Sequence, residues 1–376
     1  MPICVAVPHE TVPGERRVAL VPAVAEQLGR QDVEVHLQAG AGAAAFYRDS
    51  EYTSARLIND RADLLSGADI LLTVQPLDQE AIGQLREGST VIGFLHPHEN
   101  PECIAMMRDR NITSFAVELI PRLSRAQGMD ALSSQASIAG YKAALMAASR
   151  TARFFPMLTT AAGTIRPAKV LIIGVGVAGL QAIATAKRLG AMVEAYDVRP
   201  ETREQVESLG AKFVDVQVKA EGSGGYAREL TEEEKQQEVA VLAEHVIQAD
   251  AIISTAAVPG RPAPCIISAD MVDRMKLGAV IIDLAAESGG NCELTVPGEA
   301  FGHERVMIYG PLNVPAMLPV HASEMYAKNL YNFLSLIIKD GKLDPDWDDE
   351  IVVSAALTHA GKIRHEPTRQ AVEAAS

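Results

Sequence analysis

The sequence is poor in the features that mark secreted, metal-binding or nucleic-acid-binding proteins. Its four cysteines are scattered, with no CxxC pair, so no disulfide framework is expected and a reducing compartment is favoured. The nine histidines show no HExxH spacing, and we expect no metal site. The formal net charge of −14 argues against binding to nucleic acid or to an anionic membrane surface, because phosphate binding needs clustered lysines and arginines.

Long hydrophobic runs are also missing. A transmembrane helix needs about 20 consecutive apolar residues. The uncharged stretch 170–186 predicts a strand, a glycine turn and a helix, and the uncharged stretch 306–323 is interrupted by prolines. The first residues lack a basic region followed by an apolar one, so no signal peptide is expected. We therefore expect a soluble chain that does not insert into a membrane, which leaves a membrane-bound partner possible.

The composition that remains is ordinary for a globular protein, with 48% hydrophobic and 22% charged residues, and 376 residues are many for one hydrophobic core. Short apolar runs rich in β-branched residues alternate with polar helical segments in both halves of the chain. Such alternation predicts parallel sheets covered by helices on both faces. The predicted strands are residues 3–8, 33–37, 69–74, 90–95 and 112–117 in the first set, and 169–174, 192–197, 212–216, 250–256 and 279–285 in the second.

Two long helical stretches, roughly 133–155 and 322–339, bracket the second set of strands. We interpret them as hinges that join two doubly wound, Rossmann-like α/β domains. The last residues, RHEPTRQAVEAAS, are expected to form a frayed polar tail. The predicted domains are a split outer domain of residues 1–132 and 322–376, and a nucleotide-binding domain of residues 133–321.

The strongest local motif is the stretch KVLIIGVGVAGLQAIATAKRLGAMVEAYD, which begins at Lys169. A buried strand is followed by Gly174, Gly176 and Gly179 in the G-x-G-x-x-G spacing. The first glycine permits a tight turn, the second lets the backbone approach a pyrophosphate, and the third lets the helix pack close to the sheet. The helix then directs its free N–H groups and its positive dipole end at the phosphates. The alternative is a strand-to-helix turn that only tolerates glycine.

The next strand ends at Asp197, where a carboxylate can accept hydrogen bonds from the hydroxyls of an adenosine ribose. Because this carboxylate would repel a 2′-phosphate, NAD(H) is favoured over NADP(H), although the nearby Arg199 weakens the preference slightly. The outer domain lacks the glycine spacing, so one dinucleotide site is expected. The residues expected to contact the cofactor are Gly174, Gly176, Val177, Ala178, Gly179, Asp197, Val198, Arg199, Thr255 and Ala256.

Several motifs resemble the alanine dehydrogenase and nicotinamide nucleotide transhydrogenase superfamily. They are VPHETVPGERRVALVP near the N-terminus, FLH at residues 94–96, the glycine turn, and IIDLAAESGGNCE. The segments PRLSRAQGMDALSSQASIAGYKA and PGRPAPCIISADMVDRMKLGAVIIDLAAESGGNCELTVPGE are similar to the transhydrogenase branch. The resemblance covers nearly the whole chain.

The resemblance implies that the chain is the NAD(H)-binding component of a proton-translocating transhydrogenase. Such an enzyme transfers hydride between NAD(H) held by this component and NADP(H) held by a partner subunit, and a membrane subunit couples the transfer to proton movement. The family also implies a homodimer, peripheral on the cytoplasmic face of the inner membrane through its partner subunits.

The loop PRLSRAQGMDALSSQ carries the residues that the resemblance assigns to the nicotinamide site. Arg122 and Asp130 would form an ion pair that shapes this loop. Gln127 would lie against the nicotinamide, and Ser133 would fix its carboxamide. Neutral hydrogen-bonding groups suit hydride transfer, which needs two rings in contact with water excluded and no nucleophile. The alternative is that Asp130 or Ser133 caps the following helix, which is worth about 1 kcal/mol; Arg125 is interpreted as a surface charge.

A polar, glycine-rich stretch at 217–230 is longer than most connections, and such loops are usually functional or disordered. The resemblance implies a mobile loop that closes over bound nucleotide and presents Tyr226 to it. Gly224 and Gly225 would supply backbone freedom, and the aromatic ring would supply contact area. Tyr226 therefore joins the expected cofactor contacts. The alternative is a solvated loop in front of an acidic helix.

Two other functions remain open. Alanine dehydrogenase needs a cation for the substrate carboxylate and an acid/base group, and Arg17 and His96 match the family's residues for these roles. The essential lysine is absent, because Gln75 stands near its position, and Glu287 replaces the catalytic aspartate. We therefore expect Arg17 to pair locally and His96 to be structural. The other alternative is an NAD-binding module without chemistry, which would bind NADH and exchange no hydride.

Overall fold

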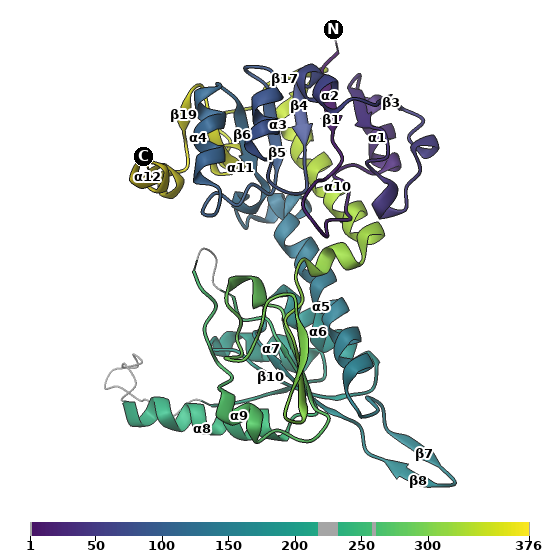
Figure 1. Cartoon of the computed structure of the whole chain (residues 1–376), viewed down its shortest axis with the longest axis vertical. Coiled ribbons are helices and arrows are strands. Elements are labelled where there is room, and N and C mark those ends of the chain that lie inside the picture. Colours follow the sequence, from purple (N-terminus) through teal and green to yellow (C-terminus); the bar gives the residue numbers. More distant parts are fainter. Residues whose placement is uncertain (1, 217–231, 258–260, 376) are drawn as a thin grey trace. The chain divides into compact units, whose positions relative to one another are not determined.

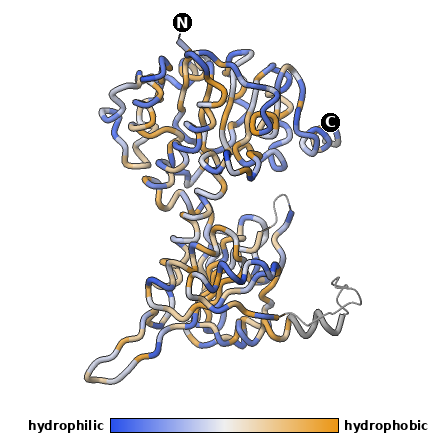
Figure 2. Tube along the Cα trace, turned by 180° about the vertical axis from the view of Figure 1, so that it is seen from behind, coloured by the Kyte–Doolittle hydropathy of each residue, from blue (hydrophilic) through white to orange (hydrophobic). Residues whose placement is uncertain are grey.

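The computed structural model describes residues 2–216, 232–257 and 261–375 (Figure 1). Over these ranges no helix is both long enough and apolar enough to cross a membrane. The apolar residues instead run through the interior of the structure, along the strands and the helix faces that pack on them (Figure 2).

The chain divides into two compact units. The first consists of Met1–Gln135 with Pro315–Ser376, and the second consists of Ala136–Val314. Each unit is an α/β structure built on a large, mainly parallel sheet, which confirms the fold class predicted from the alternation of strands and helices. The two boundaries lie a few residues from those that the sequence predicts. We describe each unit by itself.

The first unit contains an eight-stranded sheet with the order β19-β18-β6-β5-β4-β1-β2-β3. The strands β1 to β6 are all parallel, and β18 and β19 add antiparallel pairs at one edge. The parallel strands thus follow the order 3-2-1-4-5-6, which is that of dinucleotide-binding sheets. The strands are β1 (Cys4–Val7), β2 (Glu34–Gln38), β3 (Ala55–Ile58), β4 (Ile70–Leu72), β5 (Thr90–Gly93), β6 (Thr113–Ala116), β18 (Ala356–His359) and β19 (Lys362–Ile363), with a small hairpin of β16 (Ile338–Lys339) and β17 (Lys342–Leu343) beside them.

Successive residues of the central strands bury toward opposite faces of this sheet. In β4, Ile70 and Leu72 pack into one hydrophobic cluster and Leu71 packs into the other. Both faces are covered by helices, which is why these strands are continuous apolar runs in the sequence. The helices are α1 (Pro22–Gly29), α2 (Arg61–Gly67), α3 (Gln79–Gln84), α4 (Pro101–Asp109), α10 (Pro319–Ile337), α11 (Glu350–Ala355) and α12 (Glu366–Ala375), with the 3₁₀ helices η1 (Ala43–Ala45), η2 (Asp49–Glu51), η3 (Val117–Leu119) and η4 (Ser124–Met129).

The frayed polar tail expected at the C-terminus is wrong. Residues Glu366–Ala375 form α12, which packs against α4 and buries Thr368 and Val372. These two residues are four apart, a spacing that places both on one face of a helix. The strands β3, β18 and β19 were also missed. β3 and β19 are edge strands that are short and only partly apolar, and β18, which lies between β19 and β6, has only four residues.

The second unit contains a seven-stranded sheet with the order β11-β10-β9-β12-β13-β15-β14. Its parallel strands again follow the order 3-2-1-4-5-6, so the topological switch point lies between β9 and β12. Ligands of such sheets bind outside the carboxyl ends of the strands at that point. All the strands predicted for this half of the chain are present. They are β9 (Lys169–Ile173), β10 (Met192–Tyr196), β11 (Lys212–Phe213), β12 (Ala251–Ser254) and β13 (Val280–Asp283), followed by β14 (Ala300–His303) and β15 (Val306–Tyr309).

A separate two-stranded hairpin of β7 (Leu158–Thr160) and β8 (Gly163–Ile165) projects from the second unit (Figure 1). Helices flank the sheet, and the chain passes between the units within the first of them. They are α5 (Ala131–Arg150), α6 (Val177–Arg188), α7 (Arg203–Ser208), α8 (Glu232–Gln248) and α9 (Ala269–Asp273), with the 3₁₀ helices η5 (Pro200–Thr202) and η6 (Ala286–Ser288). The 3₁₀ helix η7 (Val314–Met317) crosses the second boundary between the units.

Candidate functional site

The G-x-G-x-x-G segment forms a tight turn between β9 and α6. Gly174 has a φ of +89°, a left-handed conformation that residues with a side chain rarely adopt. A Cβ atom at this position would lie 2.8 Å from Oγ1 of Thr255 and 2.9 Å from the backbone nitrogen of Ala256. Thr255 donates from Oγ1 to the Gly174 carbonyl oxygen at 3.0 Å. Only glycine therefore fits where the turn meets the end of β12.

Gly176 and Gly179 have opposite surroundings. A Cβ atom on Gly176 would meet no atom within 4 Å, so the backbone at the start of α6 is open to a ligand. A Cβ atom on Gly179 would lie 1.9 Å from the Gly174 carbonyl oxygen, so this glycine lets helix and turn pack in contact. The free N–H groups and the dipole of the first turn of α6 favour an anion at its open end. The turn therefore fits a pyrophosphate.

A further glycine, which the sequence analysis missed, supports the start of α6. A Cβ atom on Gly140 of α5 would lie 2.0 Å from the carbonyl oxygen of Ala178. The two helices thus meet through their backbones at Ala178, which is partly buried, while Val177 beside it is exposed. The small residues in the segment ASIAGYKAAL were the signal available for this close approach.

Asp197 directly follows β10, and its side chain is only 6% exposed. Its carboxylate accepts the N–H of Val175 at 2.7 Å and pairs with the Arg199 guanidinium at 3.0 Å. The contact with Val175 places the acid beside the glycine turn. Burial opposes ionisation, but the hydrogen bonds from Arg199 and Val175 outweigh it and lower the pKa of Asp197. Val198 is exposed, and Tyr226, the remaining expected contact, lies outside the described residues.

Two residues that the sequence analysis did not select fix the end of β12. The Asn291 side chain accepts the N–H of Ala256 at 3.0 Å and donates to the Ala256 carbonyl oxygen at 2.7 Å. Asp283, fully buried at the end of β13, accepts the N–H groups of Asn291 and Cys292. Because a buried carboxylate needs donors, this network fixes the loop after β13 and, through Asn291, the backbone of Ala256. Both residues lie in a family motif, but no local pattern showed what they contact.

In the first unit, the polar loop after β6 forms η4 and lines a pocket of about 370 Å³. Arg122, Gln127, Asp130 and Ser133 all line this pocket, so the fold brings together the residues that the resemblance assigns to the nicotinamide site. Arg122 and Gln127 are exposed, whereas Asp130 and Ser133 are half-buried.

The predicted ion pair between Arg122 and Asp130 is not formed, and within the described ranges Arg122 has no salt bridge. Asp130 instead accepts the N–H of Ser133 at 2.8 Å and the hydroxyl of Ser133 at 2.6 Å. Asp130 is thus the N-cap of α5, because its carboxylate satisfies an N–H group that the helix leaves unpaired. Arg125, expected as a surface charge, is exposed but pairs with Asp349 through two contacts of 2.8 Å.

The residues that would serve alanine dehydrogenase are held by their own neighbours. Arg17 pairs with Glu15 at 2.6 Å, and both side chains are buried. Gln75 donates to the same carboxylate at 2.7 Å, and Arg17 also donates to Gln135 at 2.9 Å. Burial opposes ionisation of Glu15, but Arg17 and Gln75 lower its pKa to about 2. The predicted local pairing of Arg17 is confirmed, and its charge is balanced inside the protein.

His96 and Glu287 are also held by contacts with neighbouring residues. The backbone N–H of His96 donates to the Glu118 carboxylate at 2.7 Å, and its ring stacks on Phe94 with 6.0 Å between the ring centroids. The Glu287 carboxylate accepts the N–H of Asn313 at 2.6 Å. These contacts hold the backbone in place, and a structural role for His96 stays a prediction.

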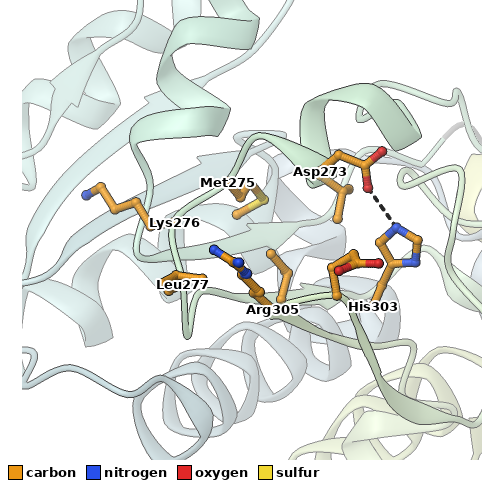
Figure 3. Close-up of a pocket in the computed structure, with 9 residues that line it drawn as sticks. Asp273, Met275, Lys276, Leu277, His303 and Arg305 are labelled. Atoms are coloured by element: carbon orange, nitrogen blue, oxygen red, sulfur yellow. Dashed lines mark hydrogen bonds and ion pairs between the residues drawn. The ribbon is translucent and has the colours of Figure 1, made fainter.

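A second pocket, of about 650 Å³, lies in the second unit and is lined by Asp273, Lys276, His303 and Arg305 among others (Figure 3). Asp273 and His303 pair in it at 2.8 Å. Its lining residue Lys276 precedes β13, and Arg305 precedes β15. They lie at the amino ends of parallel strands, whereas Gly174 follows the carboxyl end of β9. This pocket is therefore at the opposite edge of the sheet from the candidate dinucleotide site.

Two protein-family models match the chain. The model of the alanine dehydrogenase/PNT N-terminal domain matches residues 6–139, and that of the alanine dehydrogenase/PNT C-terminal domain matches residues 143–366. Together they cover nearly the whole chain, including the glycine turn and the polar loop.

The family has a transhydrogenase branch and an alanine dehydrogenase branch, and the chain is similar to named proteins of both. The chain is 45% identical over 374 residues to the first part of NAD(P) transhydrogenase subunit alpha of Rhodospirillum rubrum, covering 96% of this chain and 97% of that protein. It is 31% identical over 324 residues to alanine dehydrogenase of Mycobacterium tuberculosis, covering 84% and 82%. The crystal structure of transhydrogenase from Sinorhizobium meliloti matches with a TM-score of 0.85 and 41% identity, covering 97% of this chain and 99% of that chain. Sequence identity is higher to the transhydrogenase relatives than to alanine dehydrogenase.

Proposed function

Because the chain belongs to the alanine dehydrogenase/PNT family, we propose that it is the NAD(H)-binding subunit of an NAD(P) transhydrogenase, an oxidoreductase. The observation that supports transhydrogenase over alanine dehydrogenase is the buried pair of Arg17 and Glu15, to which Gln75 also donates. Alanine dehydrogenase needs this arginine for a substrate carboxylate, and here Glu15 already holds it through two hydrogen bonds. Gln75 at the lysine position supports the same choice, because a neutral amide cannot balance a carboxylate.

The second unit is the proposed site of NAD(H), which supplies or accepts the hydride at its nicotinamide ring when bound. The open backbone at Gly176 and the start of α6 bind the pyrophosphate. Asp197 binds the adenosine ribose and disfavours a 2′-phosphate. Both of its carboxylate oxygens already accept hydrogen bonds from Arg199, so Arg199 has to move aside when the ribose hydroxyls arrive.

The polar loop is the proposed nicotinamide contact. Its pocket offers the Gln127 amide and the Ser133 hydroxyl, two neutral groups that hydrogen-bond without titrating near neutral pH. Hydride transfer requires two rings to be held in contact with water excluded, so orientation is the main task of these side chains.

We propose that the second nucleotide, NADP(H), is bound by a partner subunit. The first unit has the strand order of a dinucleotide-binding sheet but no glycine turn after β1. The crevice of this unit lies at the carboxyl ends of β1 and β4, and it contains Glu10. The Glu10 carboxylate accepts the N–H groups of Val74 at 2.6 Å and Gln75 at 3.1 Å. A second dinucleotide therefore has no equivalent cradle in this unit. A membrane subunit that couples the transfer to proton translocation, with this chain peripheral on the cytoplasmic face, completes the proposed assembly.

A homodimer is the proposed state of this subunit, and the β7–β8 hairpin supports it. Phe154 and Met157, just before β7, and Ile165 in β8 are apolar yet 55%, 65% and 45% exposed, which is costly for a segment that faces only water. Its strand edges can also pair with another chain. Sedimentation of a Met157→Glu/Ile165→Lys variant should show a monomer. A dimer that persists in this variant would assign the contact to another surface.

The proposed function is tested by mixing the chain with the NADP(H)-binding subunit of a transhydrogenase and following one turnover by stopped flow. We expect hydride exchange between the two bound nucleotides and no NADH formation from alanine with NAD⁺. Gln127→Asn should slow the transfer while NADH affinity stays nearly unchanged, because the contact matters most in the transition state. NADH binding without any exchange would indicate an NAD-binding module, and alanine oxidation would indicate alanine dehydrogenase.

A further inference from the structure

The polar loop is anchored by a helix from the far end of the chain. The carbonyl oxygen of Gly128 accepts the side-chain amides of Asn329 at 3.0 Å and Asn332 at 2.7 Å. Both asparagines lie on α10, three residues apart, so they reach one oxygen from one face of the helix. Gly128 directly follows Gln127, which places this anchor next to the proposed nicotinamide contact.

Asn329 connects more than one element. It is only 8% exposed, and its side-chain oxygen accepts the hydroxyl of Ser134 at 2.7 Å. Ser134 lies in the first turn of α5, and its neighbour Gln135 donates to the Ala322 carbonyl oxygen in α10 at 3.1 Å. One buried amide thus joins the polar loop, the start of α5 and α10.

The other sides of the loop are fixed as well. Arg125 pairs with Asp349, which is the N-cap of α11. Ala126 and Met129 are buried in the core of the first unit. These contacts are all made within the protein, and they leave Gln127 exposed at the pocket. The loop is therefore held rigidly while the amide that is proposed to meet the nicotinamide stays accessible.

We propose that Asn329 is a positioning residue for hydride transfer, which holds the polar loop so that Gln127 meets the nicotinamide in one geometry. This inference rests on the proposed transhydrogenase function. Asn329 acts through Gly128 and Ser134, and it is not assigned to either nucleotide. The effect on the reaction is large, because a misplacement of about 1 Å can slow a reaction roughly 100-fold.

The residue type fits this role. An asparagine amide offers a donor for the Gly128 carbonyl and an acceptor for the Ser134 hydroxyl at the same time. Aspartate has the same size but no donor, so Asn329→Asp would set an oxygen against the Gly128 carbonyl. Asn332 holds the same carbonyl from the solvent side, and its removal leaves the core closed.

The test compares Asn329→Asp and Asn332→Ala with Tyr331→Phe. Tyr331 lies between them on α10, and its substitution removes only the hydroxyl that accepts from Gln31. Each full chain is mixed with the NADP(H)-binding subunit, and single-turnover transfer, NADH affinity and melting temperature are measured. We expect Asn329→Asp to slow transfer roughly 10- to 100-fold and Asn332→Ala about threefold, with NADH affinity changed less than the rate. Tyr331→Phe should transfer at the normal rate.

The transfer rate and the melting temperature together distinguish a positioning role of Asn329 from a role in stability alone. A lowered melting temperature with a normal transfer rate in Asn329→Asp would overturn the inference. If Asn329→Asp does not fold, Ser134→Ala and Gly128→Ala decide the matter. The first removes the hydroxyl that donates to Asn329, and the second puts a Cβ atom beside the carbonyl that Asn329 and Asn332 hold, 2.8 Å from the Asn332 amide. Normal transfer in both would overturn the inference too. No transfer by the unmodified chain would instead refute the proposed function.

Discussion

The two units share one order of parallel strands and differ in the connection after the first strand. In the second unit, β9 passes into α6 through residues 174–176, whereas in the first unit β1 reaches α1 only after residues 8–21. The short connection brings a helix start to the switch point and leaves the backbone open at Gly176. The long connection returns Glu10 and Arg17 to the crevice, where they bond to neighbouring residues. One topology thus gives a nucleotide cradle in one unit and a filled crevice in the other.

The difference shows that strand order provides a crevice, while the connection decides whether a ligand can enter it. In the first unit a ligand would have to displace the buried Arg17–Glu15 pair. In the second unit only the Asp197–Arg199 pair has to rearrange, and the Arg199 side chain is half exposed. Four predictions test this contrast, from the largest expected effect to the smallest.

Breaking the network of the first crevice should cost the most stability. Arg17→Met leaves the Glu15 carboxylate buried without its cation, and we expect the free energy of unfolding to fall by about 3–5 kcal/mol. Urea denaturation measures this change. Arg30→Met is the matched control, because its pair with Glu26 is exposed and should contribute little. A loss no larger than that of the control would mean that the pair does not hold the crevice together.

The pH dependence of stability should also come from the first crevice. Burial raises the pKa of Glu10 to about 7, although the N–H groups of Val74 and Gln75 favour its ionised form. A carboxyl group with a raised folded-state pKa stabilises below its unfolded value of 4.5, and this contribution is lost as the pH rises to about 7. We expect the unmodified chain to lose about 2–3 kcal/mol over this window relative to Glu10→Gln. Urea denaturation at both ends of the window checks it, and parallel profiles for the two chains would contradict the assignment.

In the second unit, two glycines should separate packing from binding. Gly179→Ala forces a methyl group against the Gly174 carbonyl, so we expect a loss of about 1–3 kcal/mol in stability together with weaker NADH binding. Gly176→Ala meets no protein atom, so it should weaken NADH binding without changing the melting temperature. NADH titration and thermal melting of both variants make the comparison. Equal destabilisation by the two substitutions would contradict the open backbone at Gly176.

The last prediction concerns the ribose contact, where the change is expected in nucleotide binding. Asp197→Asn should weaken NADH binding by about 1–3 kcal/mol, the range of a hydrogen bond to a charged group. Arg199→Ala should strengthen the preference for NADH, because it removes the cation that partly offsets repulsion of a 2′-phosphate. Isothermal titration with NADH and NADPH measures both changes. If the unmodified chain binds the two nucleotides equally well, the argument from the ribose is wrong.

Much of the fold could be read from the sequence because its central strands are buried on both faces. Such strands need apolar residues throughout, and this makes runs such as 169–174 stand out from their surroundings. The elements that were missed carry weaker patterns. β3 lies at a sheet edge and is only partly apolar, and α12 buries one narrow face, with Thr368 and Val372, among charged neighbours.

The site divides in the same way. The glycine turn and Asp197 were found because their spacing along the chain is the geometry that the ligand requires. The contact of Gly128 with Asn329 joins residues about two hundred positions apart, so no local sequence pattern predicts it. Asp130 shows the limit of a resemblance, because the N–H groups at the start of α5 are nearer to its carboxylate than Arg122 is.

By itself, the sequence determined the alternation of strands and helices, the glycine turn and the acid beside it, because each depends on neighbours within one or two elements. Only the tertiary structure decided that the first crevice is filled by Glu10 and Arg17 and that α10 holds the polar loop. The physical reason is that buried charges and amides must find partners wherever the fold brings donors and acceptors within about 3 Å, whatever their separation along the chain.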